Sequence, residues 1–306
     1  MRTGVKVTGF ALGIAVLFGA AYLAGGVFGT EAIGRTGHGA AGHSHESSRS
    51  GADGGAMADG HEMGGHEMGG HAVTGLAVTD QGYRLQRLSP DPVVGAPAEL
   101  AFQILGPNGR PVTSFVNTHE KPLHLIIARR DLSGFQHLHP ARDADGTWRV
   151  PVTLRDAGDY RVFSEFAPDG RTDSLVLGTD LTVAGDYRPV PLPAPAVVSV
   201  ADGYTVRMLG DPARGEVRFV IADAAAPVTD LQPYLAAYGH LVALRVGDLG
   251  YLHVHPDGGP GVSPPGPEIS FAASLPPAGR YRLFLEFAHR GKVHTAAFTV
   301  DTAQAP

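Results

Sequence analysis

Two stretches of the chain carry histidines at the same spacing. In each stretch one histidine is followed thirteen residues later by a His-x-His-Pro segment. The two sets are His124, His137 and His139, and His240, His253 and His255. Imidazole is a ligand of both copper and zinc, and three imidazoles leave a coordination position open for water or another ligand. The spacing therefore predicts a three-histidine metal site in each stretch.

The second stretch is predicted to form a β-hairpin. Its centre, Gly247-Asp248, is a two-residue turn of the kind that hairpins favour. Extending the register outward from this turn pairs His240 with His255. Because side chains alternate along a strand, His253 lies on the same face as His255.

The first stretch gives the same arrangement. Its centre falls between Asp131 and Leu132, which pairs His124 with His139 and brings His137 alongside. A slip of one residue would move one histidine to the opposite face, so both sites depend on the register. The alternative is that each histidine is a structural residue that has found a hydrogen bond.

Three further residues are candidates for the same sites. Glu165 and Glu286 recur in a Phe-x-Glu-Phe motif on a neighbouring strand. Each could be a carboxylate ligand, an acceptor for an imidazole N–H, or an edge residue that faces solvent. His119 lies before the first stretch, where the second copy has Leu235, so it could add only to the first site. His289 and His294 have no counterparts and are expected at the surface.

Segments outside the histidine stretches also recur. Pro111-Val-Thr returns at Pro227, and thirteen residues separate the proline from the first histidine in both copies. Residues 75–186 and 196–302 are therefore predicted to be homologous domains. The proline-rich segment 187–195 between them should be an extended linker.

Within each half, hydrophobic residues recur with a period of two, and glycine, proline and aspartate mark the turns. We therefore predict an all-β chain of two tandem immunoglobulin-like β-sandwich domains, with no helix after the N-terminal segment. The strands expected in the first domain are Leu100–Leu105, Leu123–Ala128, Trp148–Leu154, Tyr160–Phe166 and Leu175–Val183.

The N-terminal segment, residues 1–30, has Arg2 and Lys6 before a long apolar run. This pattern is typical of an export signal or of a single transmembrane helix. The run continues past the small residues that could mark a cleavage site, which favours an uncleaved anchor in the cytoplasmic membrane. The domains are expected outside that membrane, or secreted if the segment is cleaved. Residues 303–306 form a short tail.

Residues 31–74 are rich in glycine, alanine, serine, histidine and methionine, which predicts a disordered tether. A His-Glu-Met-Gly-Gly repeat in it supplies further candidate ligands: His61, Met63, His66, Met68 and His71. Thioether beside imidazole suits copper, since soft methionine selects Cu(I). A chain of this length spans roughly 35 Å, enough to reach a small domain. The alternative is a low-complexity spacer.

The composition limits the function classes. The formal charge of −6 provides no basic surface, so nucleic acid is not an expected partner. The 306 residues include no cysteine, which excludes disulfides, thiolate metal sites and cysteine nucleophiles. A metal would have to be held by histidine, methionine and carboxylate.

The chain resembles a little-characterised group of membrane-anchored, extracytoplasmic bacterial proteins with tandem His-x12-His-x-His-Pro β-domains. The resemblance rests on Lys121-Pro-Leu-His with Phe135-Gln-His-Leu-His-Pro, and on Tyr238-Gly-His with Tyr251-Leu-His-Val-His-Pro. In overall plan the chain is also similar to periplasmic β-sandwich copper-handling proteins. This second resemblance is one of architecture only. The ligand types predict a copper ion, with zinc as the alternative, and another metal-handling protein is an expected partner.

Three functions remain open from the sequence. The leading hypothesis is a membrane-anchored copper-binding protein or chaperone with no enzymatic activity. A second is an interaction module of the cell envelope that binds no metal. The third is a cupin-like metalloenzyme, because Asp143 follows the His137-x-His139 pair, but the second copy lacks an acid at that position.

Overall fold

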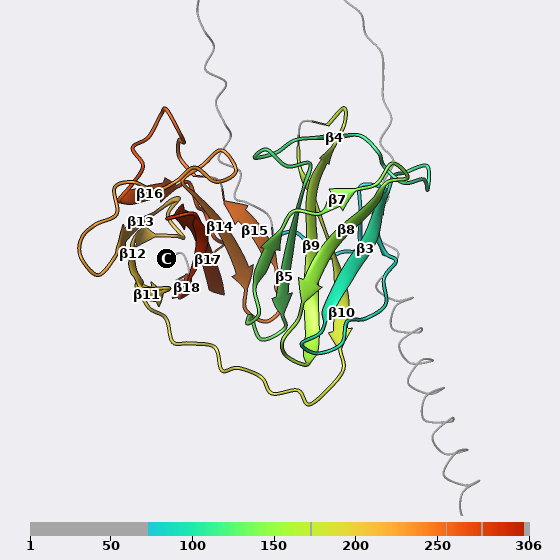
Figure 1. Ribbon diagram of the computed structural model, residues 1–306, viewed down its shortest axis with the longest axis horizontal. Helices are drawn as coiled ribbons and strands as arrows, with labels where there is room; N and C mark the ends of the chain where they lie inside the picture. The colour runs from blue at the N-terminus through green and yellow to red at the C-terminus, as the bar shows by residue number, and fades with distance from the viewer. Residues whose placement is uncertain (1–72, 172, 255, 277, 303–306) are drawn as a thin grey trace, which may run out of the picture. The chain divides into compact units, whose positions relative to one another are not determined.

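The computed structural model describes residues 73–302 except 172, 255 and 277, and these residues form β-strands and loops without a helix. The strands make two consecutive sandwiches (Figure 1), which confirms the predicted all-β fold of tandem immunoglobulin-like domains. The predicted membrane segment, nearly all of the tether and the tail lie outside the described residues. Among the described residues, no helix has the length and apolar character needed to cross a membrane.

The first domain consists of two antiparallel sheets. One has the strand order β1 (Thr79–Asp80), β2 (Tyr83–Arg87), β3 (Pro97–Leu105), β8 (Thr147–Thr153) and β7 (Ala141–Arg142). The other has the order β10 (Leu175–Val183), β9 (Gly158–Pro168), β5 (Leu123–Arg129) and β6 (Gln136–Leu138), and β4 (Phe115–Val116) also pairs with β9. The five strands predicted from the sequence are all present.

The second domain repeats this plan with fewer strands. Its first sheet has the order β11 (Val198–Ala201), β12 (Tyr204–Asp211), β13 (Glu216–Ala222) and β16 (Glu268–Phe271). Its second sheet has the order β15 (Tyr251–Val254), β14 (Gly239–Arg245), β17 (Arg280–His289) and β18 (Lys292–Asp301). The histidine hairpins are therefore β5–β6 in the first domain and β14–β15 in the second.

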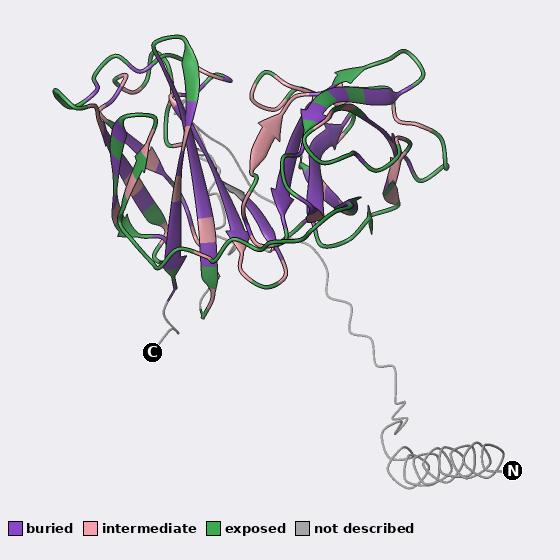
Figure 2. Cartoon of the chain, turned by 60° about the horizontal axis from the view of Figure 1, so that its bottom comes forward, coloured by how far each residue is buried: buried purple, intermediate pink, exposed green. Residues whose placement is uncertain are grey.

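Strand β5 is buried along its whole length, on both of its faces. Leu123, Leu125 and Ile127 point into the core of the first domain, together with Trp148 of the opposite sheet. Of the alternate residues, Ile126 and Ala128 belong to a separate apolar cluster. In Figure 2 the central strands are accordingly purple, while exposed residues are concentrated in the connecting loops.

The separate cluster joins the two domains. Ile126 and Ala128 of β5 pack in it with Val242 and Leu244 of β14, which lie at equivalent positions of the second domain. Two aromatic pairs extend it. The rings of Phe135 and Phe284 stack with centroids 4.1 Å apart, and those of Phe163 and Tyr251 stack at 5.1 Å. Each pair joins a hairpin of one domain to the central strand of the other, so the contact has approximate two-fold symmetry.

The linker between the domains lies against the first domain. Arg129, which is 1% exposed, pairs with Asp131 at 2.8 Å and donates a hydrogen bond to the backbone oxygen of Arg188. The backbone N–H of Val190 donates to the Asp131 carboxylate at 2.7 Å. The turn of the first hairpin therefore also fixes the start of the linker.

Candidate metal centre

The hairpin registers agree with the sequence prediction in both domains. In the first, Leu125 is opposite Leu138 and Ile126 is opposite His137. Extending this register by one residue places His124 opposite His139. Since His124 and Ile126 are two residues apart, all three histidines point to one face of the sheet. In the second domain the pairing of β14 with β15 follows the same register.

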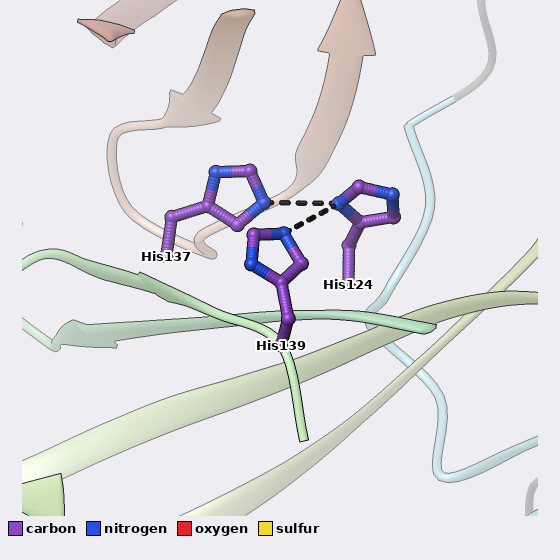
Figure 3. Close-up of side chains that lie close together, drawn as sticks. All are labelled: His124, His137 and His139. Carbon is purple, nitrogen blue, oxygen red and sulfur yellow. Dashed lines mark hydrogen bonds between the residues drawn. The ribbon is translucent and has the colours of Figure 1, made fainter. Parts of the chain in front are cut away.

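The three histidines of the first hairpin converge on one point (Figure 3). Nδ1 of His124 lies 3.1 Å from Nε2 of His137 and 3.2 Å from Nε2 of His139. The three ligand atoms lie within 4.8 Å of one another. Nitrogens that bind one tetrahedral ion at about 2.0–2.1 Å are about 3.3 Å apart. The observed separations therefore fit three ligands of a single ion.

The outer nitrogen of His124 is held by a tight turn. The backbone N–H of Thr118 donates to the carbonyl of Lys121, and the N–H of Lys121 donates to the carbonyl of Thr118. Between them, His119 and Glu120 have φ angles of 49° and 63°. This left-handed pair is unusual for residues other than glycine and asparagine. The turn places the Thr118 carbonyl 2.8 Å from Nε2 of His124. A carbonyl only accepts, so Nε2 carries the proton and Nδ1 presents its lone pair to the site.

The outer nitrogen of His137 contacts a carboxylate of the other domain. Nδ1 lies 2.5 Å from Oε2 of Glu286 on β17, and the two side chains are 0% and 8% exposed. In the neutral ring, donation from Nδ1 to this carboxylate leaves the lone pair of Nε2 facing His124. This carboxylate–imidazole arrangement is the one that orients histidine ligands of metal ions.

The inner nitrogens of the three rings contact one another. Nδ1 of His124 lies within hydrogen-bonding distance of Nε2 of both His137 and His139, and the donor and acceptor roles depend on the tautomers. A cation bound by all three nitrogens would accept a lone pair from each ring.

His139 has an unusually acidic imidazolium. Burial, followed by the charges of His137, His124 and Lys121, lowers its pKa from 6.5 to about 3. The side chain is therefore neutral, and can serve as a ligand, over the whole physiological range. An open cavity of about 590 Å³ adjoins His139 and is also lined by Lys121 and Arg142, which provides a route to the site.

This pKa predicts how the stability of the metal-free protein depends on pH. Between pH 6.5 and about 3, His139 of the unfolded chain binds a proton that the folded chain does not. Stability therefore falls as the pH drops through this range. We expect urea denaturation at successive pH values to give a decreasing free energy of unfolding. The decrease should be shallower in His139→Gln, and equal slopes would contradict the assignment.

The second hairpin repeats the holding turn. The residues Leu235 and Ala236 have φ of 53° and 60°, and the Tyr234 carbonyl lies 2.9 Å from Nε2 of His240, which is 1% exposed. The backbone of His253 lies in β15, but its side chain and all of His255 are outside the described part of the chain. A three-histidine site in this hairpin therefore remains a prediction.

His119 lies between the two hairpins. Its ring centroid is 6.2 Å from that of His124 and 5.5 Å from that of His240. The rings of His137 and His240 are 6.3 Å apart. The sequence predicts two separate sites, but these distances make the histidines of both domains near neighbours. Among the described residues, His119, Glu165, Glu286 and His240 are outside the close group of three.

The two glutamates lie where the sequence predicted, on the strand next to each hairpin. Glu165 is opposite His124 in the pairing of β5 with β9, and Glu286 is opposite His240 in that of β14 with β17. Their contacts with the other domain were not predicted. The Tyr251 hydroxyl donates to Glu165 at 2.7 Å, and burial, with the nearby Glu165 charge, raises the pKa of Tyr251.

The expectation for His289 and His294 was wrong. These residues are 3% and 6% exposed. Both are held by hydrogen bonds: His289 contacts Tyr204 at 2.8 Å, and His294 contacts Asp202 at 2.9 Å. The structure thus supports a structural role for these two residues. The predicted tether ligands, His61, Met63, His66, Met68 and His71, lie outside the described residues.

Solved structures similar to this chain have low scores. A mutant of Salmonella alpha-2-macroglobulin has a TM-score of 0.27 and 14% identity, over 76% of this chain and 15% of that one. The FN1–FN3 domains of chicken CNTN1 have a TM-score of 0.20 and 11% identity, covering 70% and 68%. The Ig1-2 module of the Drosophila receptor protein tyrosine phosphatase DLAR has a TM-score of 0.20 and 9% identity, over 72% of this chain and 98% of that one. No conclusion about function follows from these values.

No curated protein matches the chain. A family model does match it twice, over residues 77–183 and 198–304. These two matches fall on the two sandwiches and cover more than half of the sequence. The chain therefore belongs to the family described as a domain of unknown function, DUF8832, and carries two copies of that domain.

Proposed function

We propose that the protein binds a metal ion, copper or alternatively zinc, through His124, His137 and His139, and that it stores or carries the ion without catalysing a reaction. The observation that supports this proposal most strongly is the convergence of one nitrogen from each of three imidazoles, all within 4.8 Å of one another. Nδ1 of His124 and Nε2 of His137 are 3.1 Å apart, and each ring has its other nitrogen held by an acceptor. A cation at this point would be bound by both nitrogens and by Nε2 of His139.

The metal-free alternative accounts for less of this geometry. Structural histidines bond to donors and acceptors around them, as His289 does with Tyr204. In His124, His137 and His139 one nitrogen of each ring is instead directed at the other two rings. The low pKa of His139 opposes protonation of that ring.

The preference for copper comes from the tether. Its repeated histidines and methionines combine imidazole with thioether, which selects Cu(I). In this proposal the tether collects the ion and passes it to the domains at high effective concentration. The apolar N-terminal segment would hold the chain at the outer face of the cytoplasmic membrane. Another metal-handling protein would deliver or receive the ion.

A calorimetric titration of the protein tests this proposal. We expect saturable binding of Cu(I) or Cu(II) that is tighter than binding of Zn(II), with at least one equivalent per chain and with release of protons. The variant His61→Ala with His66→Ala and His71→Ala, which removes the imidazoles of the tether's His-Glu-Met repeat, should keep the domain-bound equivalent. If this variant takes up no metal, the domain site is refuted and the sandwiches become an interaction module.

A further inference from the structure

The first metal site draws one of its supporting residues from the second domain. Resting on the function proposed above, we propose that metal binding by the first domain and docking of the second domain are coupled, with Glu286 as the positioning residue that connects them. The ion then acts as a sensor of domain contact as well as a cargo.

The contact between Glu286 and His137 is the first part of the argument. Their atoms are 2.5 Å apart, and both side chains are almost completely enclosed. A buried carboxylate is strongly destabilising unless it is paired, so this bond holds both groups in place. It also selects the tautomer of His137 that directs Nε2 to the other two histidines. Without the second domain, that ring would have no carboxylate on its Nδ1 side.

The packing around Glu286 is the second part. Phe284, two residues before it on β17, stacks on Phe135, which is two residues before His137. The stacked pair and the carboxylate–imidazole pair thus both join β17 to residues 135–137 of the first hairpin. The shared apolar cluster lies beside them and draws residues from both domains. The position of Glu286 relative to His137 is therefore fixed by domain docking, and not by the fold of either domain alone.

Thermodynamic linkage supplies the consequence. A ligand that binds the docked form more tightly than the undocked form favours docking by the ratio of the two affinities. Loading the site should therefore tighten the contact between the domains, and loosening the contact should release the ion. A protein that hands metal to another protein can use such coupling, since a partner that separates the domains would lower the affinity at the moment of transfer.

The test uses the complete protein and the variant Glu286→Gln, which keeps the size of the side chain and removes its charge. We expect its affinity for the preferred ion, measured by competition with a chelator of known affinity, to be about 10–100 times weaker. The matched control is Glu268→Gln, which removes an exposed carboxylate paired with Arg218 in the same domain. This control should bind as tightly as the parent.

Nitrogen-15 spectra of the histidine rings provide a readout that general destabilisation would not change. In the metal-free parent, His137 should be protonated at Nδ1, and in Glu286→Gln the two tautomers should mix. If the parent binds the ion and Glu286→Gln binds it with the same affinity, the coupling is overturned and the proposed function stands. Absence of binding by the parent overturns both. If Glu286→Gln fails to fold, Glu286→Asp, which withdraws the carboxylate from His137, gives the same comparison.

Discussion

Replacing His137 and His139 together with alanine is expected to abolish metal binding by the first domain while the fold remains intact. Structural zinc sites with four ligands bind with about 10–16 kcal/mol, so two ligands contribute at least about 5 kcal/mol. That loss corresponds to an affinity at least about a thousand times weaker. His137 lies in β6 and His139 directly follows this strand, and neither residue belongs to the main core of the domain. Calorimetric titration with the preferred ion would measure the loss.

Circular dichroism and urea denaturation would establish that the double variant is folded. The matched control, His61→Ala with His66→Ala, removes the same number of imidazoles from the tether. It should leave the tight binding event of the domain unchanged. A double variant of His137 and His139 that binds as tightly as the parent would mean that the three-histidine cluster does not hold the ion.

Replacing Phe284 with alanine is expected to give the second large effect, on both stability and metal affinity. The ring is 4% exposed, and its stack with Phe135 is nearly parallel, at 7°. Truncating a buried phenylalanine costs about 3–5 kcal/mol of unfolding free energy. The loss should also loosen the contact that keeps Glu286 beside His137. We expect weaker metal binding at the first domain, although the substitution lies in the second.

The control for this prediction is Phe298→Ala. Phe298 is 1% exposed and packs against Phe219 inside the second domain's own core. Its removal should lower the unfolding free energy by a similar amount, yet leave the metal affinity of the folded protein unchanged. Both quantities come from urea denaturation and chelator competition on the same samples. Equal losses of affinity in the two variants would show that the effect is general destabilisation.

The hairpins could be predicted because their register depends on local information. The positions of the turn residues fix which residues face one another, and the period of two fixes the face. These rules placed His124 opposite His139, with His137 beside them. The duplication strengthened the prediction, since two copies with different apolar residues gave the same pairing.

The partners of the glutamates could not be predicted in the same way. Pairing of neighbouring strands placed Glu286 beside His240, but its bond to His137 depends on how two complete domains pack. The sequence does contain a sign of that packing. Leu125 to Ala128 and Leu241 to Leu244 are each an unbroken run of apolar residues where an outward face should be polar. A sheet covered on both sides explains such a run.

His289 and His294 were misplaced for a different reason. A residue without a counterpart in the other copy need not be exposed, because it can belong to a buried feature that only one copy has. Tyr204 and Asp202 complete these buried contacts, and they come from the opposite sheet and its leading turn. Contacts between sheets do not follow from spacing along the chain.

The aromatic pairs at the domain contact have a consequence for how the two copies can diverge. Subunits of a symmetric homodimer present the same side chain on both sides of the axis, so a change in one is a change in the other. A single chain with both copies is free of that rule. Tyr251 adds a hydroxyl where the first copy has Phe135, and His119 adds an imidazole where the second has Leu235. Fusion of the copies thus lets one molecule keep two chemically different environments at matching positions of the same scaffold.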